Sequence, residues 1–196
     1  MYTVDEIKNN YKKMSDSQIE KIALFESKGL RKDVINILRS EIKNRKLNSD
    51  LLNWVNAETK AFKEQEIIEL KNKISNLTCP NCLNNTTKLS GFEINKIISF
   101  LVYSKETNQK KVLCKNCGNK EKTTSILQNL FFGWWSRNGI LATPYLIIKD
   151  LINLFYSEKI SDRILVKMIE GNTGYFRMNG TEKEILSDFI NKFNEI

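Results

Sequence analysis

Two short motifs, CPNC at residues 79–82 and CKNC at residues 114–117, constrain this chain more than any other feature. They contain all four of its cysteines, and the chain has no histidine. A Cys-x-x-Cys turn directs two sulfurs toward one point, and a zinc ion takes four ligands at about 2.3 Å in a tetrahedral arrangement. Together the pairs predict one structural zinc site with the ligands Cys79, Cys82, Cys114 and Cys117.

Free buried thiols or a redox pair are the other uses of such cysteines. A thioredoxin-like motif is one pair at the start of a helix within an alternating strand and helix pattern, and neither motif shows that context. Four thiolates would close the coordination sphere, which leaves no position for a catalytic water. Pro80 stiffens the first turn, and we expect Gly118 to take a positive φ angle as the backbone passes the metal.

The composition favours a folded protein inside the cell. Apolar residues make up 41% of the 196 positions, which is sufficient for packed cores. The start, MYTVDEIKNNYKKM, is polar where a secretory leader is apolar, so we expect a cytoplasmic location. In that reducing compartment, paired cysteines bind metal more often than they form disulfides.

Residues 1–76 are predicted to be helical, because they contain no proline and their apolar residues recur at helical spacing. Ser15 and Gln18 form a capping box for a helix that runs to about residue 27. A second helix is expected over residues 31–47, antiparallel to the first, and a long helix over residues 51–74.

The middle region, residues 77–122, changes pattern to β-branched and aromatic residues around a polar turn, which predicts a β-hairpin between the cysteine pairs. A short helix opening at Ser90 is the alternative. Residues 123–196 are predicted to be mostly helical, with a short strand at residues 174–178 and a last helix capped by Thr181. The expected class is α+β.

The CPxC and CxxCG motifs on either side of a hairpin resemble those of zinc ribbon proteins. The likeness covers about forty residues, from Leu77 to Lys120, and it implies the four cysteines as zinc ligands and nothing more. The order of cysteine pair, GWW stretch and TP resembles uncharacterised bacterial proteins, and this implies no activity.

The aromatic segment, residues 126–148, allows three interpretations. It could fill a core as a helical hairpin interrupted at Gly133, Gly139 and Pro144. It could insert into a membrane interface through Trp134, Trp135 and Arg137, although it is too interrupted for one spanning helix. Exposed aromatic rings could also stack on nucleic-acid bases.

A basic excess lies around the cysteines, since residues 79–122 carry 8 Lys/Arg and 3 Asp/Glu. Such an excess suits an anionic partner, but solvated lysines are also common. The candidate contacts are Lys96, Lys105, Lys110, Lys111, Lys115, Lys120 and Lys122.

No catalytic constellation or phosphate-binding loop is recognisable in the sequence, so we predict no catalytic residues and no small-molecule substrate. The predicted function is a non-enzymatic zinc-binding adaptor for protein or nucleic acid. The alternative is a peripheral membrane protein that uses residues 126–148.

Overall fold

The computed structural model describes the backbone of residues 2–100 and 103–195, and their side chains except those of residues 100, 103, 104, 137, 138, 154 and 155. It is 68% helical and contains a two-stranded antiparallel sheet, so the predicted α+β class is confirmed. The chain forms two compact units. Unit 1 comprises Met1–Lys63 and Ile169–Thr181, and unit 2 comprises Glu64–Met168 and Glu182–Ile196.

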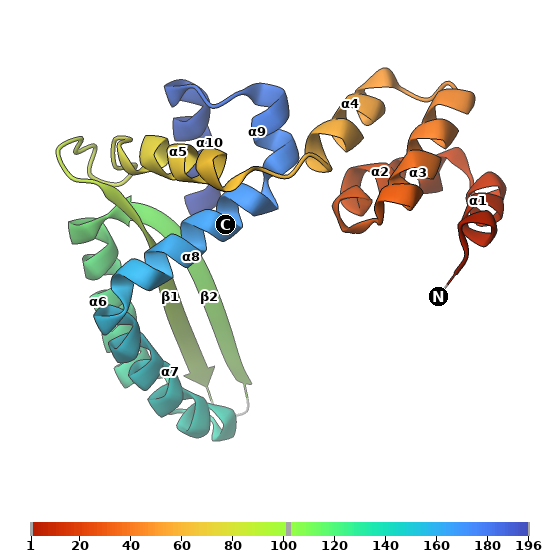
Figure 1. Ribbon diagram of the computed structural model, residues 1–196. Helices are drawn as coiled ribbons and strands as arrows, with labels where there is room; N and C mark the ends of the chain where they lie inside the picture. The colour runs from red at the N-terminus through yellow and green to blue at the C-terminus, as the bar shows by residue number, and fades with distance from the viewer. Residues whose placement is uncertain (1, 101–102, 196) are drawn as a thin grey trace. The chain divides into compact units, whose positions relative to one another are not determined.

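Unit 1 is a group of helices with an apolar interior (Figure 1). Its helices are α1 (Val4–Lys13), α2 (Asp16–Phe25), α3 (Lys32–Asn44), α4 (Ser49–Glu58) and α9 (Thr173–Asn179). Capping boxes begin α1 at Thr3 and α2 at Ser15, as predicted for α2. The buried core residues are Tyr11, Ile19, Ala23, Val34, Ile35, Leu38, Ile42, Leu51 and Val55.

The long helix predicted over residues 51–74 is wrong. It is divided into α4, which ends at Glu58, and α5, which begins at Glu64. At the end of α4 the hydroxyl of Thr59 donates a 2.6 Å hydrogen bond to the carbonyl of Val55. Such a bond weakens a helix only slightly, so it accompanies the break without explaining it.

Two further differences from the prediction concern short elements. The strand predicted at residues 174–178 is wrong, because these residues lie in α9, whose Gly174 N–H donates to the carboxylate of Glu58 at 2.5 Å. Five residues are too few for periodicity to separate a strand from a buried helix. Helix α1 was not predicted as a separate element, although the capping-box pair Thr3 and Glu6 at its start was a signal.

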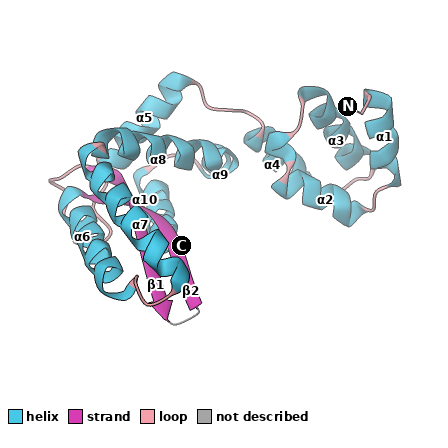
Figure 2. Ribbon diagram, turned by 90° about the horizontal axis from the view of Figure 1, so that it is seen from below, coloured by secondary structure: helices cyan, strands magenta, loops and turns pink. Residues whose placement is uncertain are grey.

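Unit 2 contains a long β-hairpin with helices beside it (Figures 1 and 2). The strands β1 (Leu89–Phe100) and β2 (Tyr103–Cys114) pair without a bulge, from Leu89 opposite Cys114 to Phe100 opposite Tyr103. The predicted hairpin is confirmed, and the alternative helix at Ser90 is wrong. The helices are α5 (Glu64–Ser75), α6 (Lys115–Phe132), α7 (Arg137–Phe155), α8 (Ser157–Gly171), which belongs to this unit up to Met168, and α10 (Lys183–Glu195).

Side chains from the helices close parts of both edges of the hairpin. On the β1 edge the carboxamide of Asn129 accepts from the N–H of Ile97 and donates to the carbonyl of Asn95, both at 2.8 Å. On the β2 edge the carboxamide of Asn194 accepts from the N–H of Val112 at 2.7 Å and donates to its carbonyl at 2.9 Å. Each amide occupies main-chain groups that a further strand would otherwise use.

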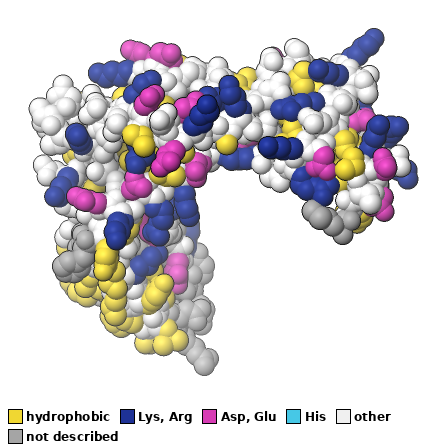
Figure 3. All heavy atoms as spheres, viewed as in Figure 1, with side chains coloured by type: hydrophobic (Ala, Val, Ile, Leu, Met, Phe, Trp, Pro, Cys, Tyr) yellow, Lys and Arg dark blue, Asp and Glu magenta, His cyan; other side chains and the backbone are white. Residues whose placement is uncertain are grey.

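The surface of unit 2 differs from one end to the other. On the face seen in Figure 3, apolar side chains cover the lower end of the unit, along α7. Lys and Arg side chains gather above this end, where α8 crosses the hairpin. The two surfaces are therefore next to each other within one unit.

Candidate functional site

The first cysteine pair lies in the loop between α5 and β1. The N–H of Cys79 donates to the carbonyl of Asn84, and the N–H of Leu83 donates to the carbonyl of Cys79, both at 2.9 Å. Leu83 has a φ angle of 56°, which lets the chain turn back sharply. These bonds fold the loop so that Cys79 and Cys82 face the start of α6.

The second pair lies where β2 passes directly into α6. Cys114 is the last residue of the strand and the N-cap of the helix, and Cys117 is in the first helical turn. Gly118 is inside the helix, so the expected positive φ angle is wrong. A Cβ atom there would overlap the ring of Phe92, so glycine permits the close approach of α6 to β1.

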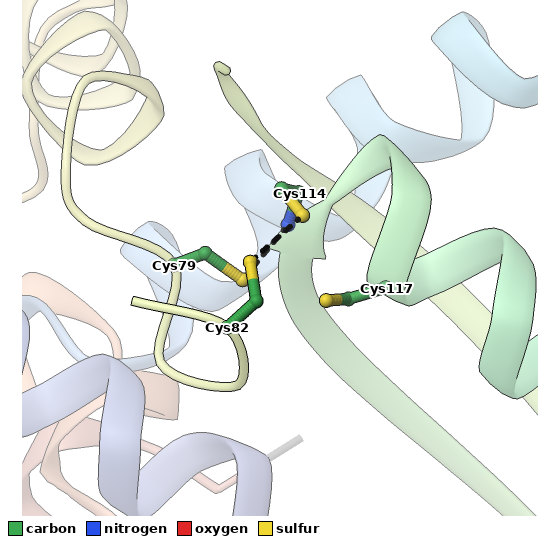
Figure 4. A group of neighbouring side chains, drawn as sticks. All are labelled: Cys79, Cys82, Cys114 and Cys117. Atoms are coloured by element: carbon green, nitrogen blue, oxygen red, sulfur yellow. Dashed lines mark hydrogen bonds between the residues drawn. The ribbon is translucent and has the colours of Figure 1, made fainter. Parts of the chain in front are cut away.

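The four sulfur atoms all lie within 4.8 Å of one another, and they point toward one centre (Figure 4). The Sγ atoms of Cys82 and Cys114 are 3.6 Å apart. Sulfurs bound tetrahedrally at about 2.3 Å from a zinc ion would be about 3.8 Å apart, so the spacing fits a metal. The cluster can thus hold a metal ion, and its four-sulfur donor set suits a thiophilic one.

The surroundings of Cys114 favour its thiolate form. Burial raises its pKa, but hydrogen bonds from the backbone of Cys117 and from the neighbouring thiols lower it by more, so that it falls to about 7. The N–H of Cys114 also donates to the sulfur of Cys79 at 3.4 Å. Burial, together with hydrogen bonds to Cys82 and Cys114, raises the pKa of Cys117 to about 12. A bound metal must therefore displace a proton from Cys117.

The position of the second pair also bears on the redox alternative. A pair at a strand-to-helix junction is a context that the sequence had not indicated, and helix N-termini favour thiolates. However, the first pair lies beside it, and all four cysteines are free thiols. A cluster of four sulfurs supports metal binding better than thiol–disulfide exchange between two of them.

The seven candidate lysines do not gather on one surface. Lys122 is only 3% exposed, and Lys111 forms an ion pair with Glu121 at 2.8 Å. Because adjacent residues of a strand point to opposite faces, Lys110 lies on the other face of the hairpin from Lys111. Lys96 and Lys105 share the face of Lys111, while Lys115 and Lys120 lie in the first turns of α6. Their role in binding remains a prediction.

The aromatic segment does not fill a core, so that interpretation is wrong for most of its large side chains. Phe131 is 65% exposed, Trp135 67% and Leu141 78%, and Trp134 is also exposed. The indole N–H groups of the two tryptophans bond to main-chain carbonyls of α6 at 2.8 and 2.9 Å. The side chain of Arg137, predicted as a contact, lies outside the described ones. α7 continues through Pro144.

Helix α7 has the opposite polarity to a helix of a water-soluble protein. Its inner side, toward β1, carries Thr143, Asp150 and Asn153 as well as Leu146, all buried. Its outer side is almost entirely apolar. We use the name apolar face for the exposed apolar residues of α6, α7 and their connection: Leu127, Leu130, Phe131, Phe132, Trp134, Trp135, Ile140, Leu141, Tyr145, Ile148, Leu151, Ile152 and Tyr156.

Beneath this face lies a network of polar side chains, of which Glu93, Asn95 and Asp150 are buried. Asn95 of β1 donates to the carboxylate of Asp150 at 2.6 Å, and Lys149 donates to that of Glu93 at 2.7 Å. Asn108 donates to both Glu93 and Asn95, at 2.6 and 2.7 Å. All charged groups of α7 with a described side chain are thus turned inward.

Burial disturbs the charges of this interior. It raises the pKa of Asp150 and lowers that of Lys122, which is on the inner side of α6. Burial also acts to raise the pKa of Glu93, but its bonds from Lys149 and Asn108 outweigh this effect and lower it. Apart from Lys122, which was predicted as a partner contact, the sequence analysis did not single out these residues, although the isolated pair Lys149 and Asp150 within a long apolar run was a signal.

No known protein family, curated protein or solved structure matches this chain. Within the described residues, no individual helix is long and apolar enough to cross a membrane. One strongly bent pair, Gly139–Asn153 with Ser157–Gly171, meets the length and composition required, with an angle of 96° between its helices.

Proposed function

We propose that the four cysteines hold a structural zinc ion and that unit 2, stabilised by it, docks on the surface of a lipid bilayer through the apolar face. The inverted polarity of α7 carries this proposal. In water, exposed apolar patches of this kind are rare on monomeric proteins, because their hydration is unfavourable. Against acyl chains the same face is favourable, and the charged groups of Lys149 and Asp150 on α7 already have partners in β1.

Residues of the apolar face suit a membrane interface. Tryptophan and tyrosine are enriched at the boundary between lipid and water, and here Trp134, Trp135, Tyr145 and Tyr156 contribute to the face. Since both indole N–H groups already have acceptors in α6, the rings can leave water without losing a hydrogen bond. This is interfacial docking, in which no helix needs to span the bilayer.

Zinc is the metal that the cluster supports best. Structural zinc sites commonly have four cysteine ligands, and they contribute directly to folding because the site does not exist in the unfolded chain. The ion would join the loop after α5 to the junction of β2 and α6. In this way it would hold the hairpin and α6 in the arrangement that displays the apolar face.

Vesicle binding tests the docking. The full chain should float with neutral phosphatidylcholine vesicles, and a Trp135→Ser/Leu141→Ser variant should bind at least about tenfold more weakly, given the burial energy of large apolar side chains. The matched control is Tyr2→Ser/Phe25→Ser, which removes two exposed aromatic residues of unit 1 and should bind normally. Equal loss in both variants, or no binding by the native chain, would refute the docking.

Salt and oligomeric state separate this function from the adaptor function that the sequence predicted. Apolar docking should persist at high salt, whereas nucleic-acid binding through lysines should weaken steeply. The native chain could instead fail to bind vesicles and form a dimer. If the Trp135→Ser/Leu141→Ser variant is then monomeric, the apolar face binds protein instead.

Elemental analysis tests the zinc. We expect about one zinc per purified chain, and loss of that zinc in Cys79→Ser and in Cys114→Ser. A folded, reduced protein without metal would refute this part of the proposal and would return attention to thiol chemistry at the second pair.

A further inference from the structure

A hollow of about 230 Å³ lies where α8 crosses the hairpin, next to the network beneath the apolar face. It is lined by Glu93, Asn108, Lys110, Arg163, Ile164 and Lys167. Since one water occupies about 30 Å³ of liquid, the hollow can receive a group as large as a phosphate.

The backbone brings the cations of this hollow together from two elements. Lys110 is directly opposite Glu93 in the strand pairing, so both side chains lie on the same face of the hairpin. Arg163 and Lys167 are four residues apart in α8 and so share one side of it. A Cβ atom on Gly91 would come within 2.8 Å of the Cβ of Ile164, which shows how closely α8 approaches this face.

The charges in the hollow are not balanced. Three cations line it, while Glu93 is its one acid and already accepts from Lys149 at 2.7 Å and Asn108 at 2.6 Å. The guanidinium of Arg163 is 3.7 Å from Glu93, beyond hydrogen-bond distance. Neither Lys110 nor Lys167 has an ion-pair partner among the residues that the structure describes. The guanidinium and both ammonium groups therefore have donors to offer.

We propose that this hollow binds a terminal phosphate, the dianionic monoester group found on some lipid headgroups and on soluble phosphate esters. Arginine offers a planar fork to phosphate oxygens and lysine offers a compact charge, so the set matches the shape and charge of the group. Both amide hydrogens of Asn108 are already bonded to Glu93 and Asn95, so the three cations alone would hold the phosphate. Glu93 contacts these cations only through its 3.7 Å ion pair with Arg163.

The choice of a lipid as the source rests on the proposed docking. With the apolar face in contact with acyl chains, the Lys and Arg side chains above it come to the level of the headgroups (Figure 3). Cytoplasmic leaflets are anionic, and each nearby Lys or Arg strengthens attachment to them.

Vesicles of matched surface charge test the site. Those containing phosphatidic acid expose a terminal phosphate, whereas those containing phosphatidylserine do not, and we expect the native chain to prefer the former by about tenfold. Arg163→Gln/Lys167→Gln should abolish the preference. Lys183→Gln/Lys192→Gln removes the same charge from exposed positions of unit 2 outside the hollow and should retain it. An equal effect of the two variants would overturn the proposal.

A second experiment separates this site from the docking itself. Titration of the native chain with soluble glycerol phosphate, followed by amide NMR shifts, should perturb residues around Arg163 and Lys110, and the Arg163→Gln/Lys167→Gln variant should not respond. If the soluble ester binds but no vesicle does, the site stands and the membrane function fails. If the soluble ester does not bind and phosphatidic acid is not preferred to phosphatidylserine, the site is refuted. Binding to neutral vesicles would still support the docking.

Discussion

Unit 1 and the part of unit 2 around α6 and α7 are both packed from helices, but with opposite polarity. In unit 1, residues such as Leu38 and Val55 are completely buried among other apolar side chains. In unit 2, Asp150, Asn129 and Ser125 are completely buried, whereas Leu141 and Trp135 face outward. Amphipathic pattern alone therefore does not say which side of a helix is inside, because the neighbouring elements decide which side they cover.

Metal removal should produce the largest difference in stability between the two units. Structural zinc contributes about 10–16 kcal/mol of apparent binding energy in small zinc domains, so chelation should expose residues 77–122 to exchange. Unit 1 contains no cysteine and should keep its protection. Hydrogen exchange with and without chelator measures this, and uniform loosening of both units would contradict a metal that serves unit 2 alone.

Truncation of a side chain in the core of unit 1 should give the next largest effect, a loss of stability. Leu38→Ala should lower the free energy of unfolding by about 2–5 kcal/mol, since it leaves a cavity at a fully buried apolar position. Urea unfolding, followed by the fluorescence of Trp54 in variants that lack the other tryptophans, reports on this unit. The exposed Phe25→Ala is the matched control and should change stability little.

Neutralising the acid of the polar interior should have a smaller and pH-dependent effect. Glu93→Gln should cost about 1.5–3 kcal/mol, because Lys149 loses a charged acceptor. The folded state lowers the pKa of Glu93 below 4.5, so its stabilisation is complete above that pH and is lost as the pH falls through the lowered pKa.

Unfolding curves across this range check the sign of the effect. The difference between the native chain and Glu93→Gln should shrink in acid, while the exposed Glu69→Gln should show no such trend. A difference that grows as the pH falls would mean that Glu93 is not stabilised as an anion.

The smallest effect on stability is expected on the apolar face. Leu141 is 78% exposed, so Leu141→Ser should change the free energy of unfolding by no more than about 0.5 kcal/mol, although it should weaken binding to vesicles. Thermal unfolding in the absence of lipid measures it. A loss of several kcal/mol would show that Leu141 is packed in solution, for example against a second copy.

Much of the candidate metal centre could be predicted from the sequence, because Cys-x-x-Cys spacing and the absence of other ligands leave few alternatives. The hairpin and the capping box at Ser15 were likewise predictable from local chemistry. The break after Glu58 was not, since residues 59–63 contain no glycine or proline to mark it.

The inverted packing of α7 could not be predicted from local sequence pattern, for a different reason. The inward position of Asp150 depends on Asn95, which is 55 residues earlier in the chain. Likewise, the acids that oppose the lowering of the pKa of the buried Lys122 by desolvation, Asp150 of α7 and Glu93 of β1, come from distant segments. Hydropathy identifies the apolar residues of α6 and α7, but the partners that turn the polar ones inward come from distant segments.

The amides that close the edges of the hairpin have a consequence for synthesis on the ribosome. Asn129 follows Ile97 by 32 residues, but Asn194 follows Val112 by 82. At 5–20 residues per second, the β2 edge at Val112 stays open for about 4–16 s after its own translation. During this interval the strand can pair with a strand of another nascent chain on the same polysome. Growth at low temperature slows elongation and would lengthen the interval.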